Sequence, residues 1–335
     1  MEGTLRPMST SQVLDRTFHL YRNNFVLFAG IAIITPALNL IAQLVQLRIF
    51  GPLIMPAQPE GMTPQFFQGF FVRVIIGSLI GAIIYLIGTS LASSATAYAV
   101  SMVHLGKPTT IAESYKKVKP IFFRILRLLL LIVVFTVGPF VLIYGLMIGA
   151  LFATAMMVKS GSHTGAMVGL GIIAILGAIA LLGSVVWMFY CLCRYALAVP
   201  ASTLENLPAG KSLRRSRLLA DGAKWSICGI VLLTFILSFV VAYALQIPAL
   251  IASGSAFITA TSHLTTTITT WIYIANFIGA TVTGPITTIA LVLVYYNQRV
   301  RKEAFDLQIL MEAVGEQNQM QAAAVAASSV PPAIG

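Results

Sequence analysis

Long apolar stretches without a charged residue alternate with short polar segments along this chain of 335 residues. Lys, Arg, Asp and Glu are absent from five runs, which cover residues 23–47, 74–103, 128–158, 160–193 and 225–298. A helix needs about 20 apolar residues to cross a bilayer, so each of the first four runs fits one span and the last fits two. The pattern therefore predicts an all-α integral membrane protein with six transmembrane helices.

Three basic segments precede spans one, three and five, at residues 9–25, 109–127 and 210–225. On the first segment, four apolar or aromatic residues recur at the spacing of one helical face: Leu14, Phe18, Tyr21 and Phe25. The patterns S-x-x-Q from Ser9 and T-x-x-E from Thr110 are typical of the first turn of a helix. We therefore expect three amphipathic helices that lie in the cytoplasmic membrane interface.

The order of these segments predicts a single membrane domain over residues 1–316. Each unit consists of an interfacial helix, a span, an outer loop and a second span; the units cover residues 9–104, 109–199 and 206–302. Because two spans return the chain to the same side, the units are expected to be parallel repeats around an axis near the membrane normal. We expect an amphipathic helix at 303–314 and a disordered tail at 317–335, where large apolar residues are few.

Several positions predict local features of the spans. Pro36 removes one backbone hydrogen bond and predicts a bend in span one, and Pro120 predicts a break before span three. The small residues at 88–101 predict a face of span two that another helix approaches closely. We place the end of span four at about residue 199 and a Thr-rich outer loop at 258–271. The first apolar run follows a polar helix of some two dozen residues, so we expect a retained first span rather than a cleaved signal peptide.

Composition agrees with a membrane protein and explains the net charge. The chain is 58% hydrophobic and only 9% charged, whereas about a quarter of the residues of a soluble protein are charged. The net charge is +11, but it is not spread evenly. Three basic residues precede span one, six lie between spans two and three, six lie between spans four and five, and three follow span six, which places 18 of the 21 on one side. By the positive-inside rule both termini are cytoplasmic, in the inner membrane of a bacterium, and no nucleic-acid partner is expected.

The basic helices also predict contacts with anionic lipid headgroups, each worth about 1 kcal/mol per Lys or Arg near the surface. The candidate residues are Arg16, Arg22, Lys116, Lys117, Arg214, Arg215 and Arg217. Arg73 and Arg194 lie near the ends of spans, where we expect them to extend toward the headgroups; a contact with a lipid phosphate is the alternative.

A second candidate set is an intramembrane polar cluster of Asn39, Gln43 and Asn276. Asn39 and Gln43 are four residues apart and share one face of a helix. Together with Gln246 these amides suit hydrogen bonds between helices, and a substrate path is the alternative interpretation.

Residues that would carry catalysis are not arranged in a recognisable pattern. No carboxylate falls within a predicted span, and the sequence has no Ser-His-Asp arrangement, phosphate-binding Gly-rich loop or HExxH pattern. Cys191, Cys193 and Cys228 are expected to be buried apolar side chains, and His163 and His263 have no carboxylate beside them to complete a metal site. We therefore expect no metal, no cofactor and no enzymatic activity.

Both ends of the membrane region resemble one bacterial family. LRPMSTSQVLDRTFHLYRNNF, KSLRRSRLLADGAKW and VLVYYNQRVRKEAFDLQIL are similar to segments of the glycerophosphoryl diester phosphodiesterase membrane-domain-like family. In the proteins that gave the family its label, such a membrane region precedes a catalytic barrel domain, whereas here we expect only an amphipathic helix and a tail after span six. The resemblance implies a six-span membrane fold and transfers no catalytic residue.

These observations favour a non-catalytic membrane protein that organises lipids or an unidentified membrane-protein partner. A transporter or channel for a small solute or lipid is the alternative, motivated by prolines and amides within the spans. An interfacial enzyme acting on phosphodiesters, with His104 or Asp221 in the reaction, is the least favoured hypothesis.

Overall fold

The computed structural model describes residues 8–51, 64–159, 163–259 and 262–303, together with positions 311 and 314. Most of the amphipathic helix expected at 303–314, and all of the tail expected at 317–335, lie outside the described residues. Within these ranges the chain is helical. Its elements are α1 (Thr10–Asn23), α2 (Phe25–Ala32), α3 (Ile34–Phe50), α4 (Pro64–His104), α5 (Ile111–Val118), the 3-10 turn η2 (Lys119–Ile121), α6 (Phe122–Lys159), α7 (His163–Tyr195), α8 (Ala198–Leu204), α9 (Ala209–Ala220), α10 (Lys224–Thr259) and α11 (Ser262–Glu303).

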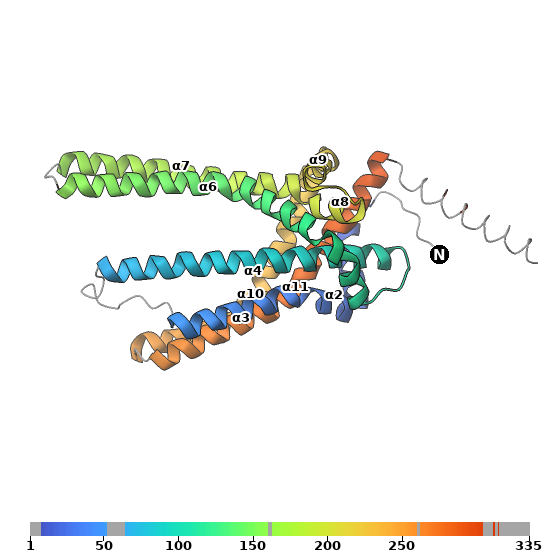
Figure 1. The fold of residues 1–335 in the computed structure, drawn as a ribbon, viewed down its shortest axis with the longest axis horizontal. Helices are drawn as coiled ribbons and strands as arrows, with labels where there is room; N and C mark the ends of the chain where they lie inside the picture. The colour runs from blue at the N-terminus through green and yellow to red at the C-terminus, as the bar shows by residue number, and fades with distance from the viewer. Residues whose placement is uncertain are drawn as a thin grey trace, which may run out of the picture.

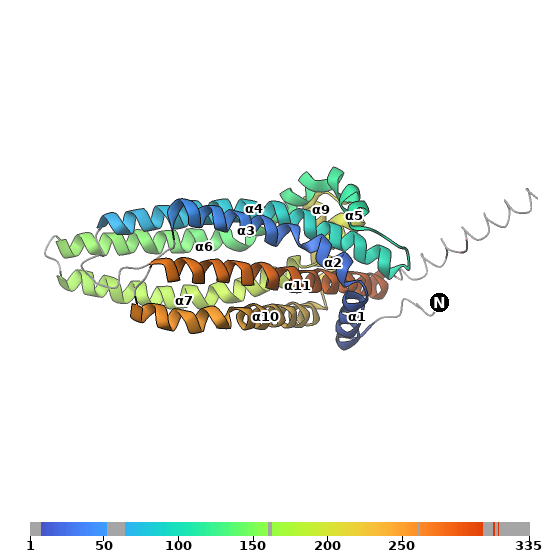
Figure 2. The same cartoon turned by 90° about the horizontal axis from the view of Figure 1, so that it is seen from below.

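Six helical segments are long and apolar enough to cross a membrane, as the charge-free runs predict. They form three antiparallel pairs of neighbours in sequence, namely α3 with α4, α6 with α7, and α10 with α11. Figure 1 shows the long helices running side by side and the short helices gathered at one end, and Figure 2 shows α1 and α5 at that same end. The prediction of an all-α membrane fold with six spans is confirmed.

The end that carries the short helices also carries most of the charge, and we call it the basic end. It holds the described Lys and Arg residues of α1, α5, α9 and the adjoining ends of the long helices, whereas Arg48, Arg73 and Lys159 lie at the other end. The core lies here too: its largest fully buried side chains include Phe28, Ile125, Leu219, Ile289 and Tyr295. Farther along the long helices, apolar side chains remain outside the packed core.

The hairpin of α6 and α7 illustrates how much apolar surface stays uncovered by the chain. Leu146 is 76% exposed and Leu182 is 69% exposed. Surfaces of this kind are unfavourable in water, at about 25 cal/mol for each Å², and favourable in the hydrocarbon of a bilayer. The core at the basic end therefore holds the six helices together, while their far halves require a membrane.

The helix starts predicted from sequence are confirmed. The Ser9 side chain accepts from the backbone of Gln12, and the Gln12 side chain accepts in return from the backbone N–H of Ser9, which completes a capping box. Thr110 caps α5 by accepting from the N–H of Glu113 at 3.2 Å.

The prolines act in two ways. Span one is broken at Ile33, between α2 and α3, because Pro36 cannot donate to the carbonyl of Ala32. Pro120 lies in η2, between α5 and α6. Both predictions are confirmed. Helices α6, α10 and α11 by contrast continue through Pro139, Pro248 and Pro285.

Two boundaries differ from the sequence prediction. Span four does not run to about residue 199: α7 ends at Tyr195, and α8 follows as a separate short helix. Pro200 is compatible with α8 because it lies in the first turn, where its missing N–H is not needed.

The Thr-rich segment expected as an outer loop is largely helical, because α11 begins at Ser262. Its threonines fit a helix by bonding to the preceding turn; the hydroxyl of Thr270 donates to the carbonyl of Thr266 at 2.8 Å.

The small residues of α4 allow close helix contact, as predicted. Ser90, Ser94, Ala95, Ala97 and Ala99 are fully buried. Gly88 lies against α3 so closely that a Cβ atom there would be 3.0 Å from the Cα of Thr35. Small side chains at this face let the backbones of α3 and α4 approach each other.

Candidate functional site

A single carboxylate at the basic end joins three helices. Glu205 follows α8 directly, and its backbone N–H donates to the carbonyl of Ala201 at 3.1 Å. Asn206 then takes a left-handed conformation with φ of 54°, which Asn tolerates better than most residues. This turn directs the chain into α9 and leaves the Glu205 side chain, only 17% exposed, between α9 and α11.

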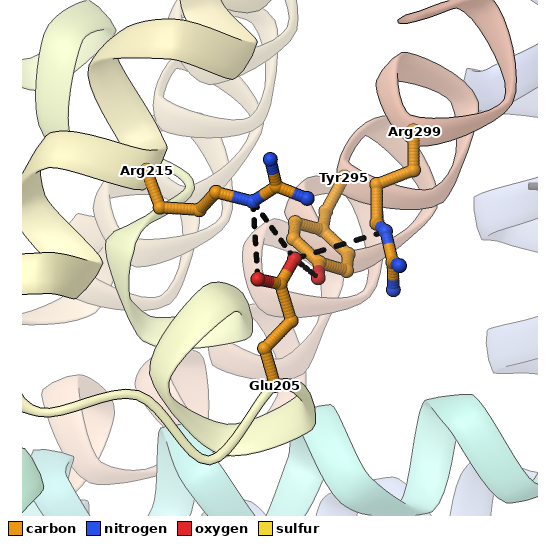
Figure 3. A network of polar contacts seen from close by, with 4 residues as sticks. All are labelled: Glu205, Arg215, Tyr295 and Arg299. Atoms are coloured by element: carbon orange, nitrogen blue, oxygen red, sulfur yellow. Dashed lines mark hydrogen bonds and ion pairs between the residues drawn. The ribbon is translucent and has the colours of Figure 1, made fainter. Parts of the chain in front are cut away.

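Two guanidinium groups and one hydroxyl surround that carboxylate (Figure 3). Arg215 of α9 places its Nε 3.0 Å from both Oε1 and Oε2. From α11, the hydroxyl of Tyr295 donates to Oε1, and the Nε of Arg299 lies 3.7 Å from the same atom. Arg299 also lies over the Tyr295 ring, 5.8 Å from its centroid. We call these four residues the Glu205 network.

The chemistry of the Glu205 network favours a structural role. Both cations stabilise the charged carboxylate, and hydrogen bonds from charged donors strengthen the pairing. The network connects the turn after α8 to α9, which follows it, and to α11, whose Tyr295 is 90 residues from Glu205. The four side chains already bond to one another, so we assign the network no proton-transfer role.

Arg124 at the start of α6 holds the same turn from another side. Its guanidinium donates to the Asn206 side chain at 2.6 Å, to the Asn206 carbonyl at 3.0 Å and to the Ser202 carbonyl at 3.0 Å. These bonds satisfy carbonyls at the end of α8 that have no helical partner. The turn is therefore fixed by α6, α9 and α11 together.

The end of α7 is bound to α9 by a second pair of contacts. Arg217 donates to the Tyr195 hydroxyl at 3.0 Å and lies 5.4 Å from the centre of its ring. Ser216 donates to the carbonyl of Arg194 at 2.9 Å. Arg194 itself donates to the Tyr190 hydroxyl one turn earlier, where its guanidinium lies over the ring.

The predicted lipid contacts divide into two groups. Arg215 and Arg217 are half-buried and bind Glu205 and Tyr195. The remaining five are exposed, and the described residues offer them no hydrogen bond or ion pair: Arg16, Arg22, Lys116, Lys117 and Arg214. We call these five the exposed basic residues. Arg73, at the opposite end, donates to the Phe50 carbonyl at the end of α3.

The hydrogen bonds of the described residues do not connect the members of the predicted polar cluster to one another. Asn39 donates to the Thr35 carbonyl of its own helix at 2.9 Å, and no hydrogen bond of Gln43 is found among the described residues. Asn276 accepts from Gln246 of α10 at 3.1 Å. A further interhelical amide, not singled out from sequence, is Gln46, which donates to the Gly77 carbonyl of α4 at 3.1 Å.

The cysteines and histidines give no metal site within the described ranges, where no three His, Cys, Asp or Glu side chains come together. Cys191 and Cys193 are buried, as expected, whereas Cys228 is half-buried; all three are free thiols. His104 stacks on the ring of Tyr296 with centroids 5.5 Å apart. The side chains of His163 and His263 lie outside the described residues.

The described residues at the basic end enclose at least two cavities. One of about 430 Å³ is lined by Asn24, Leu27 and residues 103 and 106–109. The other, of about 90 Å³, lies between α1, α10 and α11. Neither is lined by Asn39, Gln43 or Asn276.

Sequence reasoning missed the Glu205 network. Glu205 is the one acidic residue between Lys159 and Asp221, in a segment rich in Arg. That isolation was a weak signal, because an exposed Glu near basic residues is common.

Comparison with protein-family models, curated proteins and solved structures found no match to this chain. Membership of the glycerophosphoryl diester phosphodiesterase membrane-domain-like family therefore stays a prediction.

Proposed function

We propose that this multi-pass protein is a non-catalytic scaffold of the bacterial inner membrane that gathers anionic lipids at its basic end, with that end in the cytoplasm. The observation that carries the proposal is the set of exposed basic residues. They lie on three separate short helices, and none of them forms an ion pair with a described residue. An unpaired basic surface beside apolar spans suits anionic headgroups, because each cation adds about 1 kcal/mol of attraction.

The position of the other basic residues supports the same proposal. Arg124, Arg215 and Arg217 are used inside the protein, where they fix α8 and α9. The protein thus separates cations that hold the basic end together from cations that remain available to a ligand. A lipid would not need to break any internal ion pair in order to bind.

The experiment is a thermal-unfolding titration of purified full-length protein in maltoside detergent with phosphatidylglycerol or phosphatidylcholine. A ligand that binds only the folded state raises the melting temperature in proportion to its affinity. We expect phosphatidylglycerol to stabilise the wild type, and expect a variant with Arg16→Gln, Lys116→Gln, Lys117→Gln and Arg214→Gln to lose most of that stabilisation.

The matched control neutralises Arg48 and Arg73 at the opposite end, with both residues replaced by Gln. This control should keep the response to phosphatidylglycerol. Equal responses to the two lipids in the wild type, or an unchanged response in the fourfold variant, would contradict the proposal.

One observation favours a transporter as the second candidate. The amides of Gln246 and Asn276 bond to each other between α10 and α11, and Asn276 is exposed. An exposed amide within a span is unfavourable toward hydrocarbon, which suits a path for a polar solute. Proteoliposomes that take up a solute through the wild type, but much less through Asn276→Leu, would support this candidate; no flux in either would exclude the solutes tested.

A further inference from the structure

The cavity of about 90 Å³ is built around the beginning of α10. Its wall includes Thr10 of α1, the turn of Gly222 and Ala223, Ser226 of α10, and Gln298 and Arg301 of α11. A water molecule occupies about 30 Å³ in the liquid, so the space exceeds that of a single water. We propose that this cavity binds a phosphate group.

Gln298 is the side chain that most clearly points to a ligand. Only 6% of the residue is exposed, and it lines the cavity. Among the described residues its amide has no hydrogen-bond partner, whereas its neighbour Asn297 is fully paired with the backbone of Met8, at 2.8 and 3.0 Å. Because Gln298 lines the cavity, its two N–H donors are available to the acceptor atoms of a ligand there.

The start of α10 supplies further donors beside the cavity, and of its first three residues Ser226 lines the wall. Ala223 donates to the Ala220 carbonyl and Ile227 donates to the Ala223 carbonyl, both at 3.0 Å. The N–H groups between them, from Lys224 to Ser226, belong to the first helical turn and lack intrahelical acceptors. A helix of this length carries a partial positive charge at that end, which favours an anion.

The conformation of the turn before α10 depends on Gly222 and on Lys302 of α11. Gly222 has φ of 83°, a conformation that residues with a side chain rarely adopt. The ammonium group of Lys302 donates to the carbonyls of Leu218 and Asp221, each at 2.6 Å, and so fixes the turn from α11.

The charges around the cavity also favour an anion. Arg301 donates to the Met8 carbonyl at 2.7 Å, which positions its guanidinium at the wall and leaves most of its five N–H donors available. Among the described residues beside this turn, the carboxylate of Asp221 pairs with Lys224 at 2.9 Å. Arg301, Lys224 and Lys302 thus outnumber the carboxylate of Asp221, and the net charge of these four residues is positive.

Amide, hydroxyl, guanidinium and backbone N–H donors in one cavity match the oxygens of a phosphate. The phosphate can belong to a lipid headgroup or be free in solution. Trp225, 90% exposed beside the cavity, is the kind of residue that anchors at the headgroup level of a membrane. This site goes beyond the proposed lipid-binding surface and uses none of the exposed basic residues, so either proposal can fail alone.

The test measures binding to purified full-length protein in maltoside detergent. In the first arm the probe is radiolabelled inorganic phosphate; in the second it is phosphatidylglycerol retained after detergent exchange. The variant is Gln298→Leu, which keeps the size of the side chain and removes its amide. Arg214→Gln is the matched control, because it removes an exposed charge away from the cavity.

Saturable binding of inorganic phosphate that Gln298→Leu weakens by about tenfold or more, with Arg214→Gln unchanged, supports a site for free phosphate. Retention of phosphatidylglycerol without binding of inorganic phosphate, again lost in Gln298→Leu, supports a lipid phosphate. Binding of neither probe, or equal binding by Gln298→Leu and the wild type, overturns the proposal and leaves a cavity that holds only water. If Gln298→Leu does not fold, Arg301→Gln provides the same comparison, since Arg301 is exposed.

Discussion

At the scale of single residues, Glu205 has the largest expected effect on stability. Glu205→Gln keeps the shape of the side chain but removes the charge that neutralises Arg215 and Arg299. The two poorly exposed guanidinium groups then lose the carboxylate that they share. We expect a loss of about 2 kcal/mol in the free energy of unfolding, measured by thermal denaturation in detergent.

The matched control for Glu205→Gln is Asp15→Asn on α1. Asp15 is exposed, and the structure gives it no ion pair within the described residues. It should leave the melting temperature unchanged. Equal melting temperatures for the wild type and Glu205→Gln would show that the Glu205 network is not needed for stability.

The raised pKa of Tyr21 predicts that the free energy of unfolding falls at alkaline pH. Its hydroxyl donates to the Val282 carbonyl at 2.6 Å, and burial raises the pKa of Tyr21 to about 12. The unfolded chain loses this proton near pH 10, while the folded protein still holds it. The unfolded state therefore binds fewer protons, and stability falls as the pH rises from about 10 to about 12.

We expect Tyr21→Phe to reduce stability by about 1 kcal/mol at pH 7, through loss of the hydrogen bond, and to weaken the decline above pH 10. Thermal denaturation of both proteins between pH 7 and pH 11 measures the two effects. A decline of the same steepness in both proteins would assign the alkaline loss to other groups. Tyr243, exposed on α10, is the control position for a Tyr→Phe change.

The place of each charge along the chain could be predicted from sequence, but its partner could not. Arg214 and Arg215 are adjacent, yet one is exposed and the other binds Glu205. The buried face of α9 includes Ser212 and Ser216, whose hydroxyls bond to backbone carbonyls. Because serines interrupt the apolar pattern, the pattern alone does not reveal which Arg faces inward.

At the scale of elements, two glycines of α4 offer a matched comparison. Gly88 lies against Thr35 of α3, whereas a Cβ at Gly81 would meet nothing within 4 Å. We expect Gly88→Ala to destabilise the protein by about 2 kcal/mol, because the backbone of α3 must move. Gly81→Ala should be neutral or stabilising by up to about 1 kcal/mol, because Ala favours the helix more than Gly does.

Thermal denaturation of the two glycine variants in the same detergent compares them directly. Equal effects would mean that the contact between α3 and α4 does not limit stability. Loss of near-ultraviolet circular dichroism in Gly88→Ala alone would link the change to packing.

Helix starts were predictable because they depend on a few adjacent residues, as at Ser9 and Thr110. Helix α8 was not predicted, because prolines such as Pro200 and Pro208 at both ends of a short segment are typical of a loop. Its last turn is bound by Arg124, which lies 78 residues before Ser202 and donates to the Ser202 carbonyl. Contacts over such distances leave no periodic trace in the local sequence.

At the scale of the whole molecule, the number of spans follows from charge-free runs, but their arrangement does not. Helices such as α7 are apolar on nearly every side, so the pattern does not indicate which face meets another helix. The small residues of α4 are the exception, and they correctly indicate a packed face.

The proposed orientation predicts which end of the protein reagents outside the cell can reach. In a background with all three cysteines replaced by Ala, Lys117→Cys introduces a thiol at the basic end and Arg48→Cys introduces one at the other. Both positions are exposed. We expect a membrane-impermeant maleimide to label only Arg48→Cys in spheroplasts, and both variants after detergent is added. Labelling of Lys117→Cys in intact spheroplasts would reverse the proposed orientation.

The pairing of Met8 with Asn297 has a consequence for biosynthesis. The two residues are separated by 289 positions, which a ribosome needs roughly 15 to 60 s to translate. During that interval the nascent α1 has no α11 to receive Val13 and Tyr21. The bilayer surface can shelter this apolar face until the sixth span arrives, so assembly of the basic end is one of the last steps in making the protein.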